Sequence, residues 1–388
     1  MGCSWTSFRE DLIKSHFNRS IDGGVDPSSF TMTRASTQTQ TYIAWLLAAV
    51  SMTFYRLWTR VHALYSLAIL DEADCGKFHD SYILFDGDWS NNNGKKESHI
   101  VDYYRVISPL CALGNVEKMY IPPLLDEKAG VIRNQELYER KMMADIDLPP
   151  DGSHSDKKVL DIGCGRGRIA MHTAKATGAF VEAMNIDPSQ IANAKNFSTR
   201  IGLDSQTNFK VSSFNCPLPF KDAYFDAAYN VQAFSYSMDK EALFREIYRI
   251  LKPGAKFTLL EWVLLDNFDP NNADHVDYVK KTMPFIGAVD TIHYSVFENA
   301  MRKAGFDILL SEDASIGGHQ GPLINSERAH YAWIRTFAKY FLPQRFMTML
   351  LRLRVYAEAF VMADELRIAT TSYQIICKKP EQHHAKQS

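Results

Sequence analysis

The segment from Val159 to Ala176 constrains the fold of this chain more than any other. It reads as an apolar strand, Val159 to Ile162, then a turn with glycines at alternate positions, then a helical pattern. The turn holds Gly163, Gly165 and Gly167, with Cys164 as a small filler. Glycine lets the backbone lie against a ligand, and a helix N-terminus offers unpaired N–H groups. The G-x-G-x-G spacing differs from that of dinucleotide folds and phosphate loops. The segment therefore predicts a ligand at the end of a buried strand.

Further strands and helices alternate along the chain. Strands are expected at 179–186, 209–214, 225–231 and 256–263, and helices at 189–201 and 240–251, the second ended by Lys252-Pro253-Gly254. Two late strands, Phe306–Leu310 and Tyr373–Cys377, are separated by about sixty residues, too many for a hairpin turn. This order predicts a mainly parallel, doubly wound α/β sheet with its ligand at the carboxyl ends of the strands, and a helical insertion before the last strand.

Composition narrows the class of partner. The 388 residues carry a formal net charge of −2, with lysines and arginines spread along the chain, so no nucleic acid partner is expected. Six widely spaced cysteines form no C-x-x-C pair, so neither disulfides nor a metal site is expected.

The N-terminal region suggests contact with a membrane. No charged residue occurs between Arg34 and Arg56, and residues 42–55 are almost wholly apolar. This run is short for a bilayer span, so a membrane-embedded or interfacial helix over 41–70 is expected, with a buried amphipathic helix as the alternative. The positive charges that follow favour a cytosolic position for the rest of the chain, at the endoplasmic reticulum. Residues 1–6 also fit the myristoylation pattern.

Several motifs resemble those of the sterol C-methyltransferase family. They are Val-Leu-Asp-Ile-Gly-Cys-Gly from Val159, Leu-Lys-Pro-Gly from Leu251, Glu261-Trp262, and Asp-Pro-Asn-Asn from Asp269. The resemblance runs from about Tyr103 to Pro380. It implies a Rossmann-like class I methyltransferase sheet with N- and C-terminal helical additions forming a substrate cap, S-adenosylmethionine (SAM) as cofactor, and a hydrophobic steroid, terpenoid or related lipid as methyl acceptor.

The charge and apolar patterns, together with the resemblance, divide the chain. Residues 1–40 are expected to be a polar leader, 71–154 a helical substrate-cap region, 155–314 the SAM-binding core, 315–371 a helical insertion, and 372–388 the last strand with a polar tail. The sequence leaves open whether the chain forms a homo-oligomer.

The SAM site follows residue by residue from the resemblance. The expected cofactor residues are Asp161, Gly163, Cys164, Gly165, Gly167, Asn185, Asp187, Gln190, Ser213, Phe214, Asn230 and Val231. Asn185 and Asp187 lie where the ribose diol is bound, Ser213 where the family has an acid for the adenine amino group, and Phe214 where it can stack on the ring. Turn formation for Asn185, helix capping for Asp187 and core packing for Phe214 are the alternatives.

The departures from the family concern the chemistry. Gln232 stands where the family has an acid after the fourth strand, and Tyr236 stands where the family has a histidine. The family's Tyr-Glu-Tyr-Gly-Trp-Gly segment has no counterpart at 110–115. Methylating an alkene creates a cation that must lose a proton, and a neutral amide cannot take it. Tyr236, or Glu261 if it faces the pocket, is therefore the acid–base candidate. An O- or N-methyltransferase of a small specialised metabolite and a silent SAM-binding partner subunit remain as alternatives.

Overall fold

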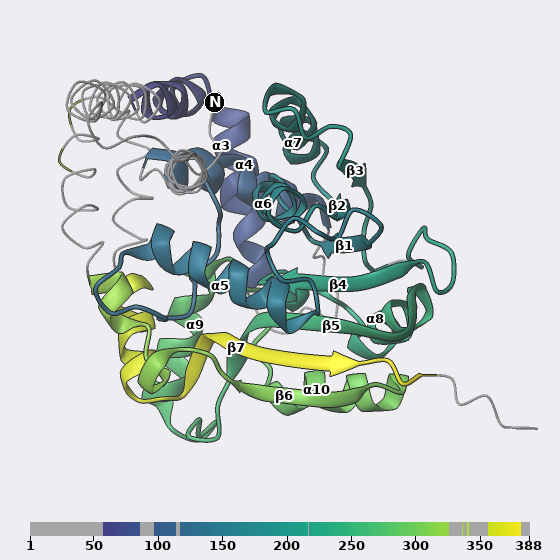
Figure 1. Ribbon diagram of the computed structural model, residues 1–388. Coiled ribbons are helices and arrows are strands. Elements are labelled where there is room, and N and C mark those ends of the chain that lie inside the picture. The colour runs from purple at the N-terminus through teal and green to yellow at the C-terminus, as the bar shows by residue number, and fades with distance from the viewer. Residues whose placement is uncertain are drawn as a thin grey trace, which may run out of the picture.

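A seven-stranded sheet forms the centre of the computed structural model (Figure 1). The structure describes residues 57–85, 97–113, 117–215, 217–325, 336, 340 and 356–381. The strand order is β3-β2-β1-β4-β5-β7-β6, with β7 antiparallel to both of its neighbours and the first five strands parallel. The strands are β1 Lys158–Ile162, β2 Phe180–Asn185, β3 Thr207–Val211, β4 Phe225–Val231, β5 Leu251–Leu264, β6 Asp307–Asp313 and β7 Ala369–Lys378. The predicted class I methyltransferase fold is confirmed.

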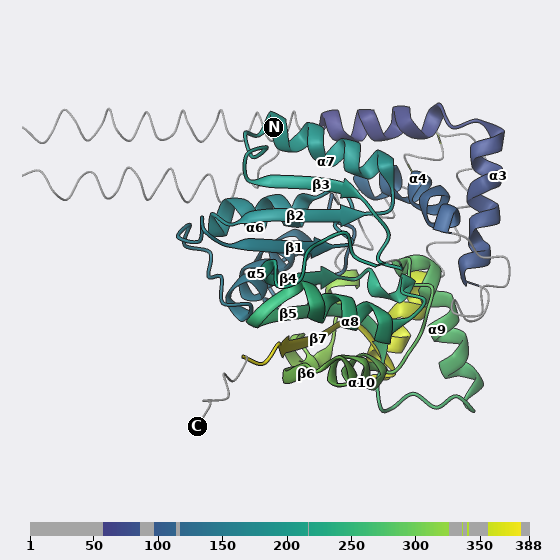
Figure 2. The same ribbon diagram turned by 90° about the vertical axis from the view of Figure 1, so that its right-hand side faces the viewer.

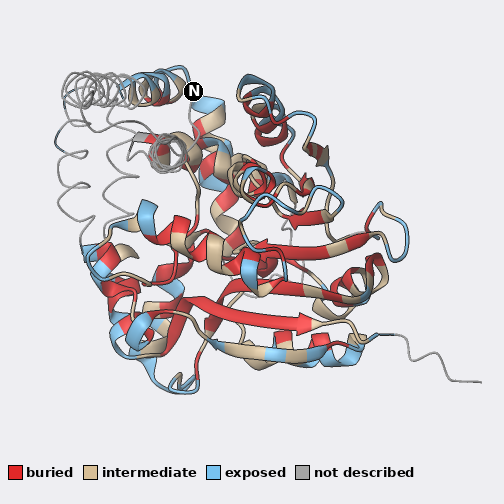
Figure 3. Ribbon diagram, viewed as in Figure 1, coloured by how far each residue is buried: buried red, intermediate tan, exposed pale blue. Residues whose placement is uncertain are grey.

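Helices cover both faces of this sheet. One face packs against α5 Val131–Asp145, α6 Arg168–Thr177 and α7 Pro188–Arg200, and the other against α8 Lys240–Ile250 and α10 Tyr294–Ala304. Successive side chains of a strand point to opposite faces. Val159 accordingly belongs to the apolar cluster on the face covered by α5, α6 and α7. Leu160 belongs to the cluster on the face covered by α8 and α10, and both side chains are fully buried. Figure 3 shows the central strands buried almost throughout.

A helical layer lies beyond the ends of the parallel strands. It contains a helix over 57–68, α3 Glu72–Ser81, the 3-10 helix η2 Tyr82–Phe85, α4 Glu97–Leu113 and α9 Ala273–Ile286. Figure 2 shows α3, α4 and α9 on the side of the sheet opposite the C-terminus. The buried side chains Phe78 and Tyr103 of this layer join Tyr236, which follows β4, in one apolar cluster. Tyr103 also donates a hydrogen bond to the Pro284 carbonyl at 2.6 Å. The layer therefore packs directly over the carboxyl ends of the strands.

The predicted helix 240–251 is confirmed to within one residue, but the prediction that Lys252-Pro253-Gly254 caps it was wrong. Helix α8 ends at Ile250, and Leu251 already has extended backbone and pairs with Phe225 of β4. The three residues lie inside β5, where the pairing with β4 shifts register. Gly254 has φ +82° and donates its N–H to the Lys379 carbonyl at 2.8 Å. Its left-handed backbone serves a bulge in the strand rather than a helix cap.

The N- and C-terminal predictions are covered only in part. The leader 1–40 and the whole apolar segment 42–55 lie outside the described residues, as does about half of 315–371. In the part of the chain that the structure describes, no helix is long and apolar enough to span a bilayer. The insertion contributes helical residues 321–325 and 356–365, and β7 begins at Ala369, earlier than expected.

Candidate active site

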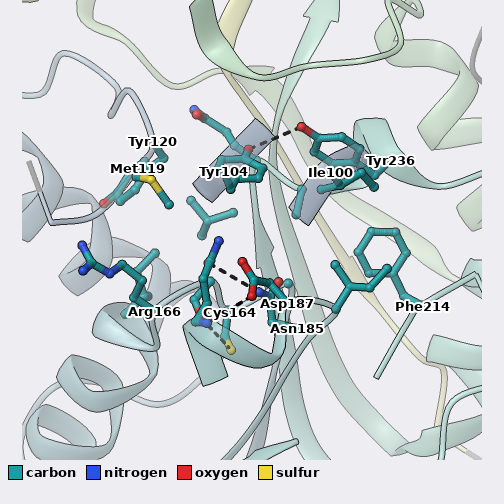
Figure 4. A pocket seen from close by; sticks show the side chains of 18 of the residues that line it. Ile100, Tyr104, Met119, Tyr120, Cys164, Arg166, Asn185, Asp187, Phe214 and Tyr236 are labelled. Carbon is teal, nitrogen blue, oxygen red and sulfur yellow. Dashed lines mark hydrogen bonds between the residues drawn. The ribbon is translucent and has the colours of Figure 1, made fainter. Parts of the chain in front are cut away.

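A cavity opens where β1, β2, β3 and β4 end, beneath α4 (Figure 4). The predicted residues that line it are Gly163, Cys164, Gly165, Asn185, Asp187, Gln190, Ser213, Phe214, Val231, Gln232 and Tyr236. Asp161, Gly167, Asn230 and Glu261 lie outside its lining. Prediction from the sequence missed thirteen lining residues: Glu97, Ile100, Tyr104, Glu117, Lys118, Met119, Tyr120, Arg166, Arg168, Ile169, Ile186, Asn215 and Ala233. The structure thus adds seven residues of the N-terminal region, and six neighbours of the predicted ones, to the sequence-predicted set.

The glycine turn forms the floor of the cavity. Gly163, Gly165 and Gly167 have φ values of +83°, +52° and +71°. A Cβ on Gly163 would lie 2.6 Å from the Cβ of Ala233. A Cβ on Gly167 would lie 2.4 Å from the Phe209 ring. Both the left-handed backbone and the close packing therefore require glycine here.

Two polar side chains hold this turn from below. Asp161 is buried, and its Oδ2 accepts a hydrogen bond from the Tyr229 hydroxyl at 3.1 Å. Burial raises the pKa of Asp161 to about 7, although the Tyr229 hydrogen bond opposes this. Asn230 donates from Nδ2 to the Ile162 carbonyl at 2.6 Å, and its Oδ1 accepts from the Ala233 N–H at 3.4 Å. In the structure, Asp161 thus binds the Tyr229 side chain, and Asn230 binds the backbone on either side of the cavity floor.

Polar groups at the ends of β2 and α7 form one side of the cavity. Asp187 Oδ1 accepts from the backbone N–H groups of Ser189 at 2.7 Å and Gln190 at 3.3 Å, so the helix-cap alternative for Asp187 is confirmed. Asn185 Nδ2 lies 3.4 Å from Gln190 Oε1. Side-chain acceptors next to a glycine backbone fit the hydroxyl-rich nucleoside part of SAM, and Phe214 offers an aromatic face beside them. The residues present therefore fit this cofactor.

Residues 117–125, which we call the strap, cross the cavity. At one end, the Glu117 carboxylate pairs with Arg168 Nε at 3.2 Å, next to the glycine turn. Lys118 and Tyr120 bind the buried Glu139 of α5 at 2.6 and 2.8 Å. Burial alone would raise the pKa of Glu139, but Lys118 and His172 together lower it to about 2. The strap is thus tied to the core by ionised side chains.

Gln232 fastens the middle of the strap. Its Oε1 accepts from the Ile121 N–H at 3.1 Å, and its Nε2 donates to the carbonyls of Ile121 at 2.8 Å and Thr371 at 2.7 Å. Gln232 also has φ +52°, which is uncommon for a residue other than glycine and is typical of functional sites. The amide therefore joins strap, β4 and β7.

The opposite wall of the cavity is aromatic and apolar. The Tyr236 hydroxyl donates to the Gly287 carbonyl and lies 3.5 Å from the Tyr104 hydroxyl. Burial raises the pKa of Tyr236 well above its usual value, so its phenol stays neutral. Ile100 and Met119 complete this wall (Figure 4).

Glu261 supports this wall from behind. Its buried carboxylate accepts from the backbone N–H groups of Phe234 at 2.6 Å and Trp262 at 2.9 Å, and burial raises its pKa to about 7. It therefore holds the 3-10 turn η3 Phe234–Tyr236. Glu261 was an acid–base candidate only if it faced the pocket. It lies outside the cavity lining, so this condition is not met.

Comparison with known proteins agrees with this site. A family model described as "Methyltransferase domain" matches residues 160–259. The chain is 32% identical over 218 residues to a sterol 24-C-methyltransferase of Eremothecium gossypii, covering 56% of this chain and 58% of that protein. It is 30% identical over 259 residues to a botryococcene C-methyltransferase of Botryococcus braunii, covering 64% and 67%. The chain thus spans about 60% of the lengths of these relatives.

Solved structures share the fold at lower identity. The cyclase SpnF has a TM-score of 0.59 at 20% identity, covering 74% of this chain and 98% of that one. The cyclopropane synthase MmaA2 of Mycobacterium tuberculosis has a TM-score of 0.58 at 14% identity, covering 68% and 90%. Fold, cavity and relatives lead to one conclusion: the chain belongs to the sterol C-methyltransferase-like family of SAM-dependent methyltransferases.

Proposed function

We propose that this enzyme methylates a carbon–carbon double bond of a hydrophobic steroid, terpenoid or related lipid. The observation that carries the proposal is the wall of Ile100, Tyr104, Met119 and Tyr236 opposite the glycine turn. Apolar and aromatic side chains bind an apolar acceptor by burying its surface. The relatives named for sterol and botryococcene methylation support the same class of acceptor.

The chemistry of such an acceptor matches the groups in this wall. When bound, SAM supplies an electrophilic methyl group. An alkene that gains this group carries a positive charge, and the faces of Tyr104 and Tyr236 stabilise such a charge in a site shielded from water. The charged product must then lose a proton from a neighbouring carbon. We assign its acceptance to the Tyr236 oxygen, which in the same step passes its own proton along its hydrogen bond to the Gly287 carbonyl, so that the phenol stays neutral.

Replacement of Tyr236 tests this assignment. Tyr236→Phe keeps the ring and removes the oxygen, so turnover should fall about a hundredfold while S-adenosylhomocysteine binding, measured by calorimetry, is unchanged. Tyr248→Phe serves as the control, because this tyrosine of α8 lies outside the cavity lining. An unchanged turnover in Tyr236→Phe would remove Tyr236 from the proton transfer.

The acceptor class is tested separately. The purified full chain is incubated with methyl-labelled SAM and either the lipid or the aqueous fraction of host cells, and labelled products are identified by mass spectrometry. The proposal expects label in a sterol- or terpenoid-sized product of the lipid fraction. Label only in a polar metabolite would instead favour an O- or N-methyltransferase, whose acceptor needs alignment but no cation-stabilising wall.

We also propose that the N-terminal region attaches the enzyme to the cytosolic face of a membrane, at the endoplasmic reticulum. The support is the helix over 57–68 and the turn after it, where Leu57, Val61, Tyr65 and Ile69 recur every four residues and are 51–63% exposed. This spacing places them along one side of a helix. Trp58, 60% exposed, is of the type that favours membrane interfaces.

A further inference from the structure

The carboxylate of Glu97 lies at the position where the cofactor site lacks an acid. The loop after β3 carries Ser213 in place of the family's acid for the adenine amino group. The Ser213 hydroxyl instead donates to Glu97 Oε1 at 2.6 Å, and Asn215 Nδ2 donates to the same oxygen at 3.0 Å. Glu97, Ser213 and Asn215 all line the cavity. Glu97 begins α4, 116 positions away in sequence, so only the fold brings the three residues together.

We propose that Glu97 binds the 6-amino group of the SAM adenine in place of the missing acid at position 213. Two hydrogen bonds hold Oε1, whereas Oε2 has no hydrogen-bond partner among the described residues and is left to accept one. A carboxylate is acceptor-only, and an amino group is a donor that suits it. Phe214, the next residue after Ser213, also lines the cavity and offers an aromatic face to it (Figure 4).

This assignment links cofactor binding to the acceptor wall. Glu97 shares α4 with Ile100 and Tyr104 of that wall. Asn215, which binds Glu97, also donates to the Tyr236 carbonyl at 3.1 Å, and its Oδ1 accepts from the Met238 N–H at 2.8 Å. Adenine that binds Glu97 therefore fixes the first turn of α4 and, through Asn215, the turn that carries Tyr236. The cofactor helps to position the surface that receives the acceptor.

The test is a thermodynamic cycle on the full chain. Calorimetry measures the Kd of S-adenosylhomocysteine and of its purine analogue, which has hydrogen in place of the 6-amino group, for wild type and Glu97→Ala. A hydrogen bond to a charged group predicts that wild type prefers S-adenosylhomocysteine about tenfold or more, and that this preference falls to about one in the variant. Asp102→Asn, on the same helix but outside the cavity lining, should keep the wild-type preference.

A swap of the acid provides the second measurement. Ser213→Asp alone should weaken binding of S-adenosylhomocysteine, because two carboxylates then lie side by side. In the Glu97→Ala background, Ser213→Asp should restore both affinity and preference for the 6-amino group. An equal loss of affinity for both ligands in Glu97→Ala would show a purely structural role and overturn the proposal. Normal affinities with lost turnover would also overturn it, because they would place Glu97 at the acceptor.

Discussion

Of the two glycines that line the cavity, Gly163 has the stricter requirement for a residue without a side chain. Its backbone has φ +83°, and an added Cβ would lie 2.6 Å from that of Ala233. The left-handed backbone costs an alanine about 1–2 kcal/mol, and overpacking adds about 1–3 kcal/mol. Gly163→Ala should therefore lower the melting temperature and weaken S-adenosylhomocysteine binding. Gly202→Ala should incur only the backbone cost, because Gly202 has φ +72° but its added Cβ would meet no atom within 4 Å. Equal melting temperatures for the two variants would contradict this account.

The buried Asp161 should give stability a recognisable pH dependence. Its pKa rises from 3.8 to about 7 on folding, mainly through burial. Between these values the folded protein holds a proton that the unfolded chain has released, so the contribution of this carboxyl to stability falls as pH rises. Asp161→Asn removes this term. The melting temperature of the variant relative to wild type should therefore increase from pH 5 to pH 8 in thermal denaturation. A difference that is constant over this range would show that Asp161 keeps an ordinary pKa.

Single residues also show how far sequence reasoning reaches. Gly163, Gly165 and Asn185 line the cavity as predicted, because each follows directly from a local strand–turn pattern. Glu97 could not be predicted, since its relation to Ser213 exists only when α4 is folded over the sheet. Arg168 stands inside the glycine motif, yet its ion pair with Glu117 gives no signal in sequence.

Among the structural elements, the strap and its clamp at Gln232 were not anticipated. Family comparison identified position 232 as a lost acid, whereas the structure uses both ends of the amide on backbone groups. Leu110, in the region compared with the family's Tyr-Glu-Tyr-Gly-Trp-Gly segment, is buried in α4. The strands were predicted well because each is a short apolar run between turns. The Lys252-Pro253-Gly254 segment was misread because a left-handed glycine serves a strand bulge as well as a helix end.

Restoring the family's acid at this position should damage the protein. In Gln232→Glu, a carboxylate would face the carbonyl oxygens of Ile121 and Thr371, which lose their donor. Each buried group left unsatisfied costs about 1–3 kcal/mol. We expect a lower melting temperature and weaker S-adenosylhomocysteine binding at pH 8, with partial recovery at pH 5, where a protonated Glu can donate. Gln206→Glu, in the loop before β3, is the control. Full stability together with higher turnover would show that position 232 tolerates a base.

Over the whole molecule, the helical layer brings the proposed membrane-binding helix, part of the proposed acceptor wall and Glu97 to one side of the sheet. The helix over 57–68 and α3 pack with α4, and α4 supplies Glu97 and Tyr104 to the cavity. A lipid acceptor that leaves a membrane through this layer would reach the cavity without crossing the sheet. This arrangement explains why an apolar N-terminal region accompanies a methyltransferase core.

Membrane attachment through this layer is open to direct measurement. In flotation with vesicles of neutral and anionic phospholipid, the full chain should move with the lipid. Trp58→Glu with Tyr65→Glu places two charges on the exposed apolar side of the helix and should shift protein to the soluble fraction. The double variant Glu241→Lys with Lys303→Glu, which exchanges the two exposed charges of an ion pair between α8 and α10, is the control. Unchanged flotation of the Trp58 and Tyr65 variant would contradict attachment through this helix.

The bond formed by the transferred methyl group shows whether the enzyme methylates a carbon–carbon double bond. With 13C-methyl SAM and the acceptor isolated from the host lipid fraction, NMR of the purified product reports which atom carries the label. We expect a methyl group bonded to carbon, with the neighbouring double bond moved or retained after proton loss. A label on oxygen or nitrogen would contradict it, because the wall of Tyr104 and Tyr236 would then serve no cation.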